Sequence, residues 1–226
     1  KSRSLISKIS KDNFSNDNLN FGRGKYTQIG SRKVWVQRLS YVGELGFEIY
    51  INNIDAKEIY ELIIKEGKNY KLSHCGSHAM DTMRMESGFL HWGHDISPEE
   101  NQYEAGLNFA ISYKKKIDFI GKESLLKIKD KKKRKRLVML SLKDSDPGHP
   151  LLLHEEPIYL NNDIIGRTTS GNYSFNYKKN LAFGYINSRY TNEELKKMKL
   201  CVEVAKKKYL AMVEVMPLKN KQVRNL

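Results

Sequence analysis

The chain has 226 residues, and its 40 Lys and Arg against 26 Asp and Glu give a formal charge of +14 at pH 7. This length suits one or two domains with a real core, and no apolar run approaches the ~18 residues that a membrane span needs. The two cysteines, Cys75 and Cys201, stand far apart without a C-x-x-C motif, and no leader-like apolar segment opens the chain. We therefore expect a soluble protein of a reducing compartment.

Half of the net charge lies in one tract. Residues 127–136 hold eight basic side chains and one Asp, a local balance of +7. The other lysines are scattered among Asn and Ile, and no stretch resembles an aromatic-studded basic sheet for stacking bases. We interpret the tract as a linker that its like charges keep solvated, with nucleic-acid binding as the alternative.

The amino-terminal segment is polar, with isolated apolar residues. This pattern predicts a segment whose packing partners lie upstream. Gly22-Arg23-Gly24 lacks the third glycine and the preceding strand of a dinucleotide site, so we expect none there. The isolated apolar residues are Leu5, Ile6, Ile9, Phe14 and Leu19.

Two short strands about a glycine-bracketed turn are predicted next. Residues 34–39 and 47–51 each alternate with a period of two. A turn centred on Glu44-Leu45 would place Tyr41 directly opposite Glu48. A phenol beside a carboxylate suits a planar heterocycle with N–H donors, although an ordinary cross-strand pair satisfies the same spacing.

Two helices follow the hairpin. The first begins at Asp55, with Glu58 in the position of a capping box, and ends at Gly67. The second covers residues 77–86, where Asp81 and Arg84 are spaced to pair with each other. Both patterns indicate packing rather than chemistry.

A histidine-rich segment comes next. His91, His94 and Asp95 could surround a metal ion, but their spacing is no established ligand pattern, so we expect no metal site. Ser97-Pro98 with Glu100 predicts a helix start. Further along the chain, the pattern predicts a strand over 105–112 and a glycine turn leading into a short helix over 119–126.

After Arg136 the chain becomes a series of short strands with turn signals between them. Six strands in about ninety residues predict a small barrel or sandwich. The predicted strands cover residues 137–142, 158–160, 164–168, 181–187, 200–205 and 209–215.

Several motifs follow the order found in a known family. The hairpin reads Tyr41-Val-Gly-Glu-Leu-Gly-Phe-Glu48, and the second predicted helix lies in Gly76-Ser-His-Ala-Met-Asp-Thr-Met-Arg-Met-Glu-Ser-Gly88. Glu104-Ala-Gly-Leu107, Phe119-Ile-Gly-Lys122 and Ile165-Gly-Arg-Thr-Thr-Ser-Gly171 follow. Together they resemble the glycine cleavage T-protein family, folate-dependent aminomethyltransferases, over nearly the whole chain. Arg38-Leu-Ser-Tyr41 and His91-Trp-Gly-His-Asp95 are most similar to the carboxy-terminal half of dimethylglycine and sarcosine dehydrogenases.

The resemblance implies an α+β fold in two domains. Residues 1–126 would be an incomplete folate-binding domain, an antiparallel sheet with helices, and 137–226 a small all-β barrel, joined by the basic linker 127–136. The implied cofactor is tetrahydrofolate, with FAD only in a missing amino-terminal domain of the parent protein. The expected partners are folate and, through the missing half, a small N-methyl amine, with neither nucleic acid nor membrane, in a bacterial cytosol or a mitochondrial matrix.

The resemblance also implies particular site residues. No catalytic residue is expected, because the family's aspartate falls upstream of the matched region, and Asp81 and Asp95 fall in packing and turn segments. T-proteins proper have an Arg where this chain has Met80, which favours the dehydrogenase branch. The implied folate contacts are Tyr41, Glu48, Ile49, Tyr50 and, on a later strand, Phe109.

The expected function is one-carbon transfer, of a methylene or aminomethyl group, to tetrahydrofolate. The chain would be a module of a T-protein-like enzyme or of an FAD-dependent N-methylamine dehydrogenase, and its turnover would need the missing half. One alternative is a related folate-dependent demethylase that accepts a sulfur- or oxygen-linked methyl group. Another is a non-catalytic folate-binding or scaffold protein of the same fold.

Overall fold

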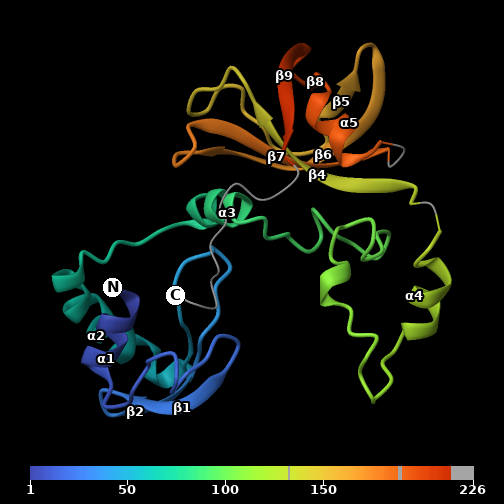
Figure 1. Ribbon diagram of the computed structural model, residues 1–226. Helices are drawn as coiled ribbons and strands as arrows, with labels where there is room; N and C mark the ends of the chain where they lie inside the picture. The colour runs from blue at the N-terminus through green and yellow to red at the C-terminus, as the bar shows by residue number, and fades with distance from the viewer. Residues whose placement is uncertain (132, 188–189, 215–226) are drawn as a thin grey trace. The chain divides into compact units, whose positions relative to one another are not determined.

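The computed structural model describes residues 1–131, 133–187 and 190–214, which form two compact units (Figure 1). Of the described residues, 1–80 form the first, called the N-terminal unit, and those between 81 and 214 form the second, called the barrel unit. Within the described residues, no helix combines the length and the apolar character that crossing a membrane requires.

The N-terminal unit is a three-stranded antiparallel sheet with helices on one face (Figure 1). Side chains from the helices and from the inner face of the sheet form its core, with Ile6 only 3% exposed and Val36 fully buried. The strands, in spatial order, are β1 Gly24–Ile29, β2 Arg32–Gln37 and β3 Glu48–Tyr50. The helices are α1 Ser2–Ile9 and α2 Ala56–Gly67, with the short 3-10 turns η1 Asn53–Asp55 and η2 Lys68–Tyr70.

The prediction that the amino-terminal apolar residues pack against an upstream segment was wrong. Ile6, Ile9, Phe14 and Leu19 are all buried, and they pack with Ile59 and the inner side chains of the sheet. The error has a clear origin, since strand β1 was not recognised and these residues therefore had no visible partner. Burial of four such side chains supplies much of the apolar contact that holds this unit together.

The predicted pairing of Tyr41 with Glu48 was also wrong. In the structure Gln37 is the residue opposite Glu48, and residues 38–47 form a loop rather than a tight turn. Arg38 continues the bonding on the side of β1, where its N–H donates to the carbonyl of Arg23 at 2.9 Å and its carbonyl accepts from Gly22 at 2.8 Å. The ladder between β2 and β3 ends at the pair of Gln37 and Glu48, so the connection is a loop of residues 38–47.

The capping box predicted at the start of α2 does not form. Neither Asp55 nor Glu58 caps the helix; instead, both carboxylates bind Arg32, at 3.3 Å and 2.7 Å. Arg32 begins β2, so this contact joins the start of the helix to the sheet. The two carboxylates that the sequence pattern assigned to local capping thus form ion pairs with Arg32, which is distant in the sequence.

The barrel unit confirms the predicted barrel. Its six strands close in the order β4-β7-β6-β5-β8-β9, with every neighbouring pair antiparallel. Leu140, Ile158 and Val202 are completely buried in its core. The strands are β4 Lys135–Leu142, β5 Pro157–Leu160, β6 Asp163–Ser174, β7 Lys179–Asn187, β8 Leu200–Val204 and β9 Lys207–Glu214, and α5 Asn192–Lys197 lies between β7 and β8. Val215, the last residue of the sixth predicted strand, lies outside the described residues.

The segment between α3 Ser77–Glu86 and the barrel differs from two predictions. Ser97 and Glu100 hydrogen-bond as in a helix cap, at 2.9 Å and 2.6 Å, but the chain turns there without forming a helix. The strand predicted over 105–112 is absent, and residues 108–110 form the 3-10 turn η3 Asn108–Ala110. The predicted helix after Gly121 is confirmed as α4 Lys122–Ile128, and Gly121 has a φ of +89°, which favours glycine.

Side chains at the end of the basic tract have specific partners in the barrel unit. Arg134 binds Glu104 at 3.2 Å and Lys135 binds Glu100 at 2.5 Å. Arg136 donates to the amide oxygen of Asn192 at 2.7 Å. These three positive charges therefore lie beside polar groups of the same chain, which leaves fewer of them for phosphates.

Candidate functional site

Glu48 and Tyr50 lie together on the face of the sheet that is turned away from α1 and α2, called the outer face. Strand β3 alternates, so these two side chains are exposed while Ile49 packs on the opposite side against the core. The Tyr50 phenol donates a hydrogen bond of 2.7 Å to Glu48 Oε2. That hydrogen bond and the charge of the carboxylate raise the pKa of Tyr50 above its ordinary value.

The five predicted folate residues do not all lie on this face. Ile49 points into the core cluster, so only its backbone borders the outer face. Tyr41 is half-buried in the loop 38–47. Phe109 belongs to η3 of the barrel unit, where its ring is 82% exposed. The structure thus brings a phenol beside a carboxylate, as predicted, but the phenol is that of Tyr50 and not that of Tyr41.

The outer face carries an aromatic row that the sequence analysis missed. Tyr26 pairs with Trp35 across β1 and β2, and Trp35 pairs with Tyr50 across β2 and β3. The rings of Tyr26 and Trp35 meet edge to face with centroids 5.0 Å apart. The sequence analysis considered an aromatic-studded sheet only as a basic surface for stacking bases, and it did not predict this row. The tight turn of Gly30 and Ser31, with Gly30 at a φ of +58°, was the signal that could have revealed this hairpin.

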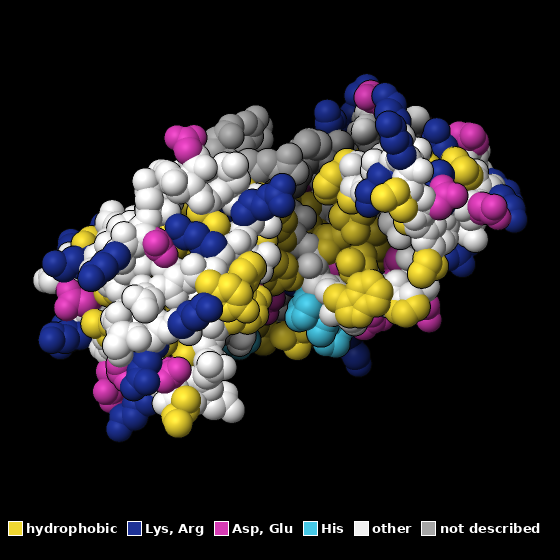
Figure 2. Space-filling view, turned by 90° about the horizontal axis from the view of Figure 1, so that it is seen from below, with side chains coloured by type: hydrophobic (Ala, Val, Ile, Leu, Met, Phe, Trp, Pro, Cys, Tyr) yellow, Lys and Arg dark blue, Asp and Glu magenta, His cyan; other side chains and the backbone are white. Residues whose placement is uncertain are grey.

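The chemistry of this face fits a planar ring with N–H donors. Within the described residues, Tyr50 is the one hydrogen-bond partner of the Glu48 carboxylate, and it uses Oε2, so Oε1 can accept from a ligand. Gln37 lies directly opposite Glu48 and adds an amide that can both donate and accept. On the face shown in Figure 2, Lys and Arg side chains are scattered among hydrophobic and uncharged ones.

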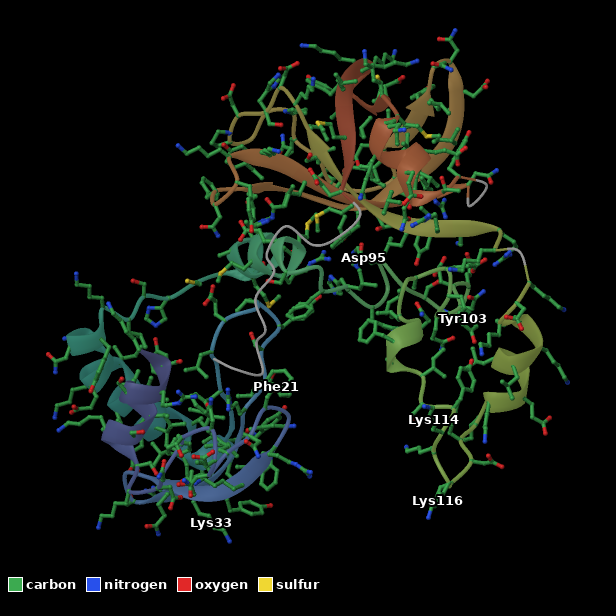
Figure 3. All side chains as sticks on the ribbon, in the orientation of Figure 1. Phe21, Lys33, Asp95, Tyr103, Lys114 and Lys116 are labelled. Atoms are coloured by element: carbon green, nitrogen blue, oxygen red, sulfur yellow. The ribbon has the colours of Figure 1, made fainter. Side chains whose placement is uncertain are left out.

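A second cluster of polar side chains, around Asp95 in the barrel unit, stabilises the fold. Asp95 is fully buried and accepts hydrogen bonds from Arg84 at 2.5 Å, Thr169 at 2.6 Å and Ser170 at 2.8 Å, as well as from the backbone N–H of His91 at 2.9 Å. Figure 3 shows Asp95 close beneath the barrel strands of its unit. Arg84 and His91 donate to Oδ2, and Thr169 and Ser170 donate to Oδ1, so neither carboxylate oxygen is free for acid–base chemistry.

The neighbouring residues of this cluster were partly predicted. The pairing of Asp81 with Arg84 is confirmed, with Arg84 Nε 3.2 Å from the Asp81 carboxylate. His91 and His94 stack with ring centroids 4.5 Å apart. Across the ranges that the structure describes, no group of three or more His, Cys, Asp and Glu could hold a metal ion.

Comparisons with known proteins place the two parts of the chain in one family. Residues 1–115 match the GCVT N-terminal domain, and residues 135–219 match the glycine cleavage T-protein C-terminal barrel domain. The second match covers the strands that close the barrel.

Curated relatives include both oxidoreductases and transferases. The chain is 38% identical over 173 residues to 4-methylaminobutanoate oxidase (formaldehyde-forming) of Paenarthrobacter nicotinovorans, covering 76% of this chain and 21% of that protein. It is 36% identical over 186 residues to the mitochondrial dimethylglycine dehydrogenase of Homo sapiens, covering 81% and 21%. It is 37% identical over 171 residues to an aminomethyltransferase of Listeria monocytogenes, covering 76% and 45%. The chain thus spans about a fifth to less than half of the length of these relatives.

A solved structure has the same fold. The aminomethyltransferase T of the glycine cleavage system from Bartonella henselae superposes with a TM-score of 0.81 at 22% identity, over 97% of this chain and 57% of that chain. Taken with the two domain matches, this shows that the chain belongs to the glycine cleavage T-protein family of aminomethyltransferase-type enzymes.

Proposed function

We propose that this chain is a tetrahydrofolate-binding module that serves one-carbon transfer. The observation that carries the proposal is the exposed Glu48 carboxylate, with one oxygen held by Tyr50 and the other open, in a chain of this family. The relatives named dimethylglycine dehydrogenase and aminomethyltransferase support the same reading. When bound, tetrahydrofolate would supply the acceptor for a methylene unit carried on an amine.

In this proposal, the side chains of the outer face bind and orient the ligand. Glu48 accepts hydrogen bonds from the N–H groups of the pterin, and the phenol of Tyr50 fixes the rotamer of that carboxylate. A pterin ring held in one orientation already has its reactive edge directed at the one-carbon donor, so little orientational entropy is lost when the two react. This orientation of the ring is the main contribution that we assign to the protein. Tyr41 remains a predicted contact of this ligand, and Phe109, which belongs to the barrel unit, remains a prediction from the family resemblance alone.

No residue of this chain is proposed as the general acid or base. Asp95 is buried and fully hydrogen-bonded, and Asp81 is engaged by Arg84. We propose that the general acid or base belongs to another part of a longer parent enzyme, of the bacterial cytosol or the mitochondrial matrix. The FAD that would oxidise an N-methyl amine would also be bound in another part of that enzyme. This is consistent with the chain covering 21% of the dimethylglycine dehydrogenase that it matches.

The alternatives differ in what surrounds the same folate site. A related demethylase would bind folate equally well but would lack an FAD domain in its parent protein. A non-catalytic scaffold of this fold would bind folate, and its parent would lack the acid–base residue.

Nucleic-acid binding through residues 127–136 is an alternative of a different kind. It would give a gel shift that weakens steeply with salt, and an absent or salt-insensitive shift would refute it.

The proposal is tested by calorimetric titration of folinic acid into the 226-residue chain and into Glu48→Gln. Loss of one charged acceptor should weaken binding by roughly 1.5 to 3 kcal/mol. Glu61→Gln is the matched control, because Glu61 is an exposed carboxylate of the same unit that lies on α2. Equal affinities of the wild type and Glu48→Gln would remove Glu48 from the site, and absence of binding to the wild type would refute the proposed function.

A further inference from the structure

The outer face of the sheet extends well beyond Glu48 and Tyr50. Three rows cross it from β2: Gln37 between Gly24 and Glu48, Trp35 between Tyr26 and Tyr50, and Lys33 beside Gln28. An acceptor and an amide thus lie at one end, aromatic rings lie in the middle, and a cation lies at the other end.

The indole of Trp35 is positioned to receive a ring. It lies across Gly24, where a Cβ would come within 2.4 Å of the indole Cζ2, so only glycine allows this close approach. Tyr26 supports the indole edge to face on the same strand pair. The indole therefore rests on the backbone of β1 at Gly24, which belongs to the row of Gln37 and Glu48, and its side chain is partly exposed.

The far end of the face is basic. Lys33 extends from β2 on the side away from the helices (Figure 3), with its Nζ 4.7 Å from the centroid of the Tyr26 ring. It borders a hollow of about 300 Å³ that Lys11, Asp12 and Gln28 also line. Two ammonium groups against one carboxylate give this hollow a net positive charge. Gln37 and Lys33 are four residues apart in β2, a separation of roughly 13 Å at the usual rise of a strand.

We propose that the outer face is one continuous binding track for an extended ligand that has a planar ring at one end and carboxylates at the other. Trp35 stacks on the ring whose N–H edge Glu48 and Gln37 bind, and Lys33 and Lys11 receive the carboxylates. This assignment rests on the proposed function, since tetrahydrofolate has this layout: a pterin joined through an aminobenzoyl group to glutamate. It adds stacking and tail-binding residues that the hairpin motif does not contain.

The chain has two tryptophans, Trp35 and Trp92, so the indole N–H resonance of Trp35 can be assigned with Trp92→Phe and followed by NMR. The ligands are folinic acid, neopterin as a pterin without the tail, and p-aminobenzoylglutamate as a tail without the pterin. We expect folinic acid and neopterin to shift the Trp35 indole resonance to saturation, and p-aminobenzoylglutamate to leave it in place.

Two variants then separate the ring from the tail. Trp35→Leu should raise the Kd of folinic acid and of neopterin by about tenfold, the typical effect of losing one ring–ring stack. Lys33→Gln should raise the Kd of folinic acid about threefold at low salt and leave that of neopterin unchanged, as expected for an exposed charge pair. Tyr60→Leu and Lys65→Gln are the controls, because both side chains are exposed on α2 of the same unit.

The possible failures have different meanings. If Glu48→Gln weakens folinic acid but Trp35→Leu does not, the track is wrong and the proposed function stands. An equal effect of Lys33→Gln on neopterin and folinic acid would contradict the tail assignment. If the chain does not bind folinic acid, the proposed function fails. A shift of the Trp35 indole resonance with neopterin would then still support the stacking of a ring on Trp35, and no shift would refute that stacking as well.

Discussion

Replacing Asp95 by Asn removes one negative charge from a site in the barrel unit that is closed to solvent. Arg84, whose side chain is 3% exposed, would keep its positive charge there, with its Nη1 facing an amide in place of a carboxylate. The one oxygen that Asn keeps would stay with the hydroxyls of Thr169 and Ser170, which now reach Asp95 Oδ1 at 2.6 Å and 2.8 Å. The substitution changes neither the size nor the shape of the side chain, so the effect would report electrostatics and hydrogen bonding.

The expected loss is large compared with the stability of a domain. Removing one partner of a buried ion pair costs about 3 to 5 kcal/mol, and we place Asn near 3 kcal/mol because it retains one carbonyl oxygen. A typical domain has about 5 to 15 kcal/mol in total. The Asp95→Asn protein should therefore fold, with a free energy of unfolding that is clearly lower.

Urea unfolding, followed by the fluorescence of Trp92 in a Trp35→Phe background, measures this loss. Asp118→Asn is the matched control in the same unit: its carboxylate is also 2.5 Å from a cation, on Lys122, but it is 85% exposed. Such a pair contributes less than about 1 kcal/mol. If Asp95→Asn and Asp118→Asn lowered the free energy of unfolding equally, the reasoning that burial decides the strength of this network would be refuted.

Three further predictions concern the rest of the chain. Ile6→Ala should lower the stability of the N-terminal unit by about 2 to 5 kcal/mol in urea unfolding, and a negligible loss would contradict the packing of α1 within this chain. Glu48→Gln should lower the pKa of Tyr50 towards about 10, seen by NMR titration of labelled tyrosines, and an unchanged pKa would contradict their hydrogen bond. Burial alone would raise the pKa of Glu100, but hydrogen bonds from Lys135 and from a serine outweigh it and lower the pKa, so this carboxylate stabilises the fold above about pH 4.3. That contribution is lost as the pH falls through the lowered pKa; Glu100→Gln should therefore lose less stability than the wild type between pH 6 and pH 3, and equal losses would contradict the assignment.

The barrel could be predicted because its information is local. Most of its strands contain short apolar runs bounded by turn residues, and the predicted strands 137–142 and 181–187 lie within β4 and β7, whereas β6 extends beyond the predicted 164–168 through polar residues to Ser174. The pairing of Asp81 with Arg84 could be predicted for the same reason, since a helix fixes residues three apart as neighbours. Neither required knowledge of what the rest of the chain does.

The sheet could be predicted only in part, because register depends on long-range contacts. The alternation of residues 47–51 correctly placed Glu48 and Tyr50 on one face. The partner of Glu48 was wrong because the two strands are joined by a loop of residues 38–47 and not by a tight turn, and the spacing of residues does not reveal where the pairing ends. Trp35 was overlooked for a related reason: a tryptophan in a strand becomes part of a row only when both neighbouring strands are in place.

The most direct test of the central claim follows the backbone amide resonances of the isotopically labelled 226-residue chain during titration with folinic acid. Binding on the outer face predicts saturating shifts in residues 24–26, 33–37 and 48–50, with smaller changes in the inner core residues and in α5 of the barrel unit. Shifts that avoid these three strands, or that persist unchanged in Glu48→Gln, would contradict the claim that this face binds folate.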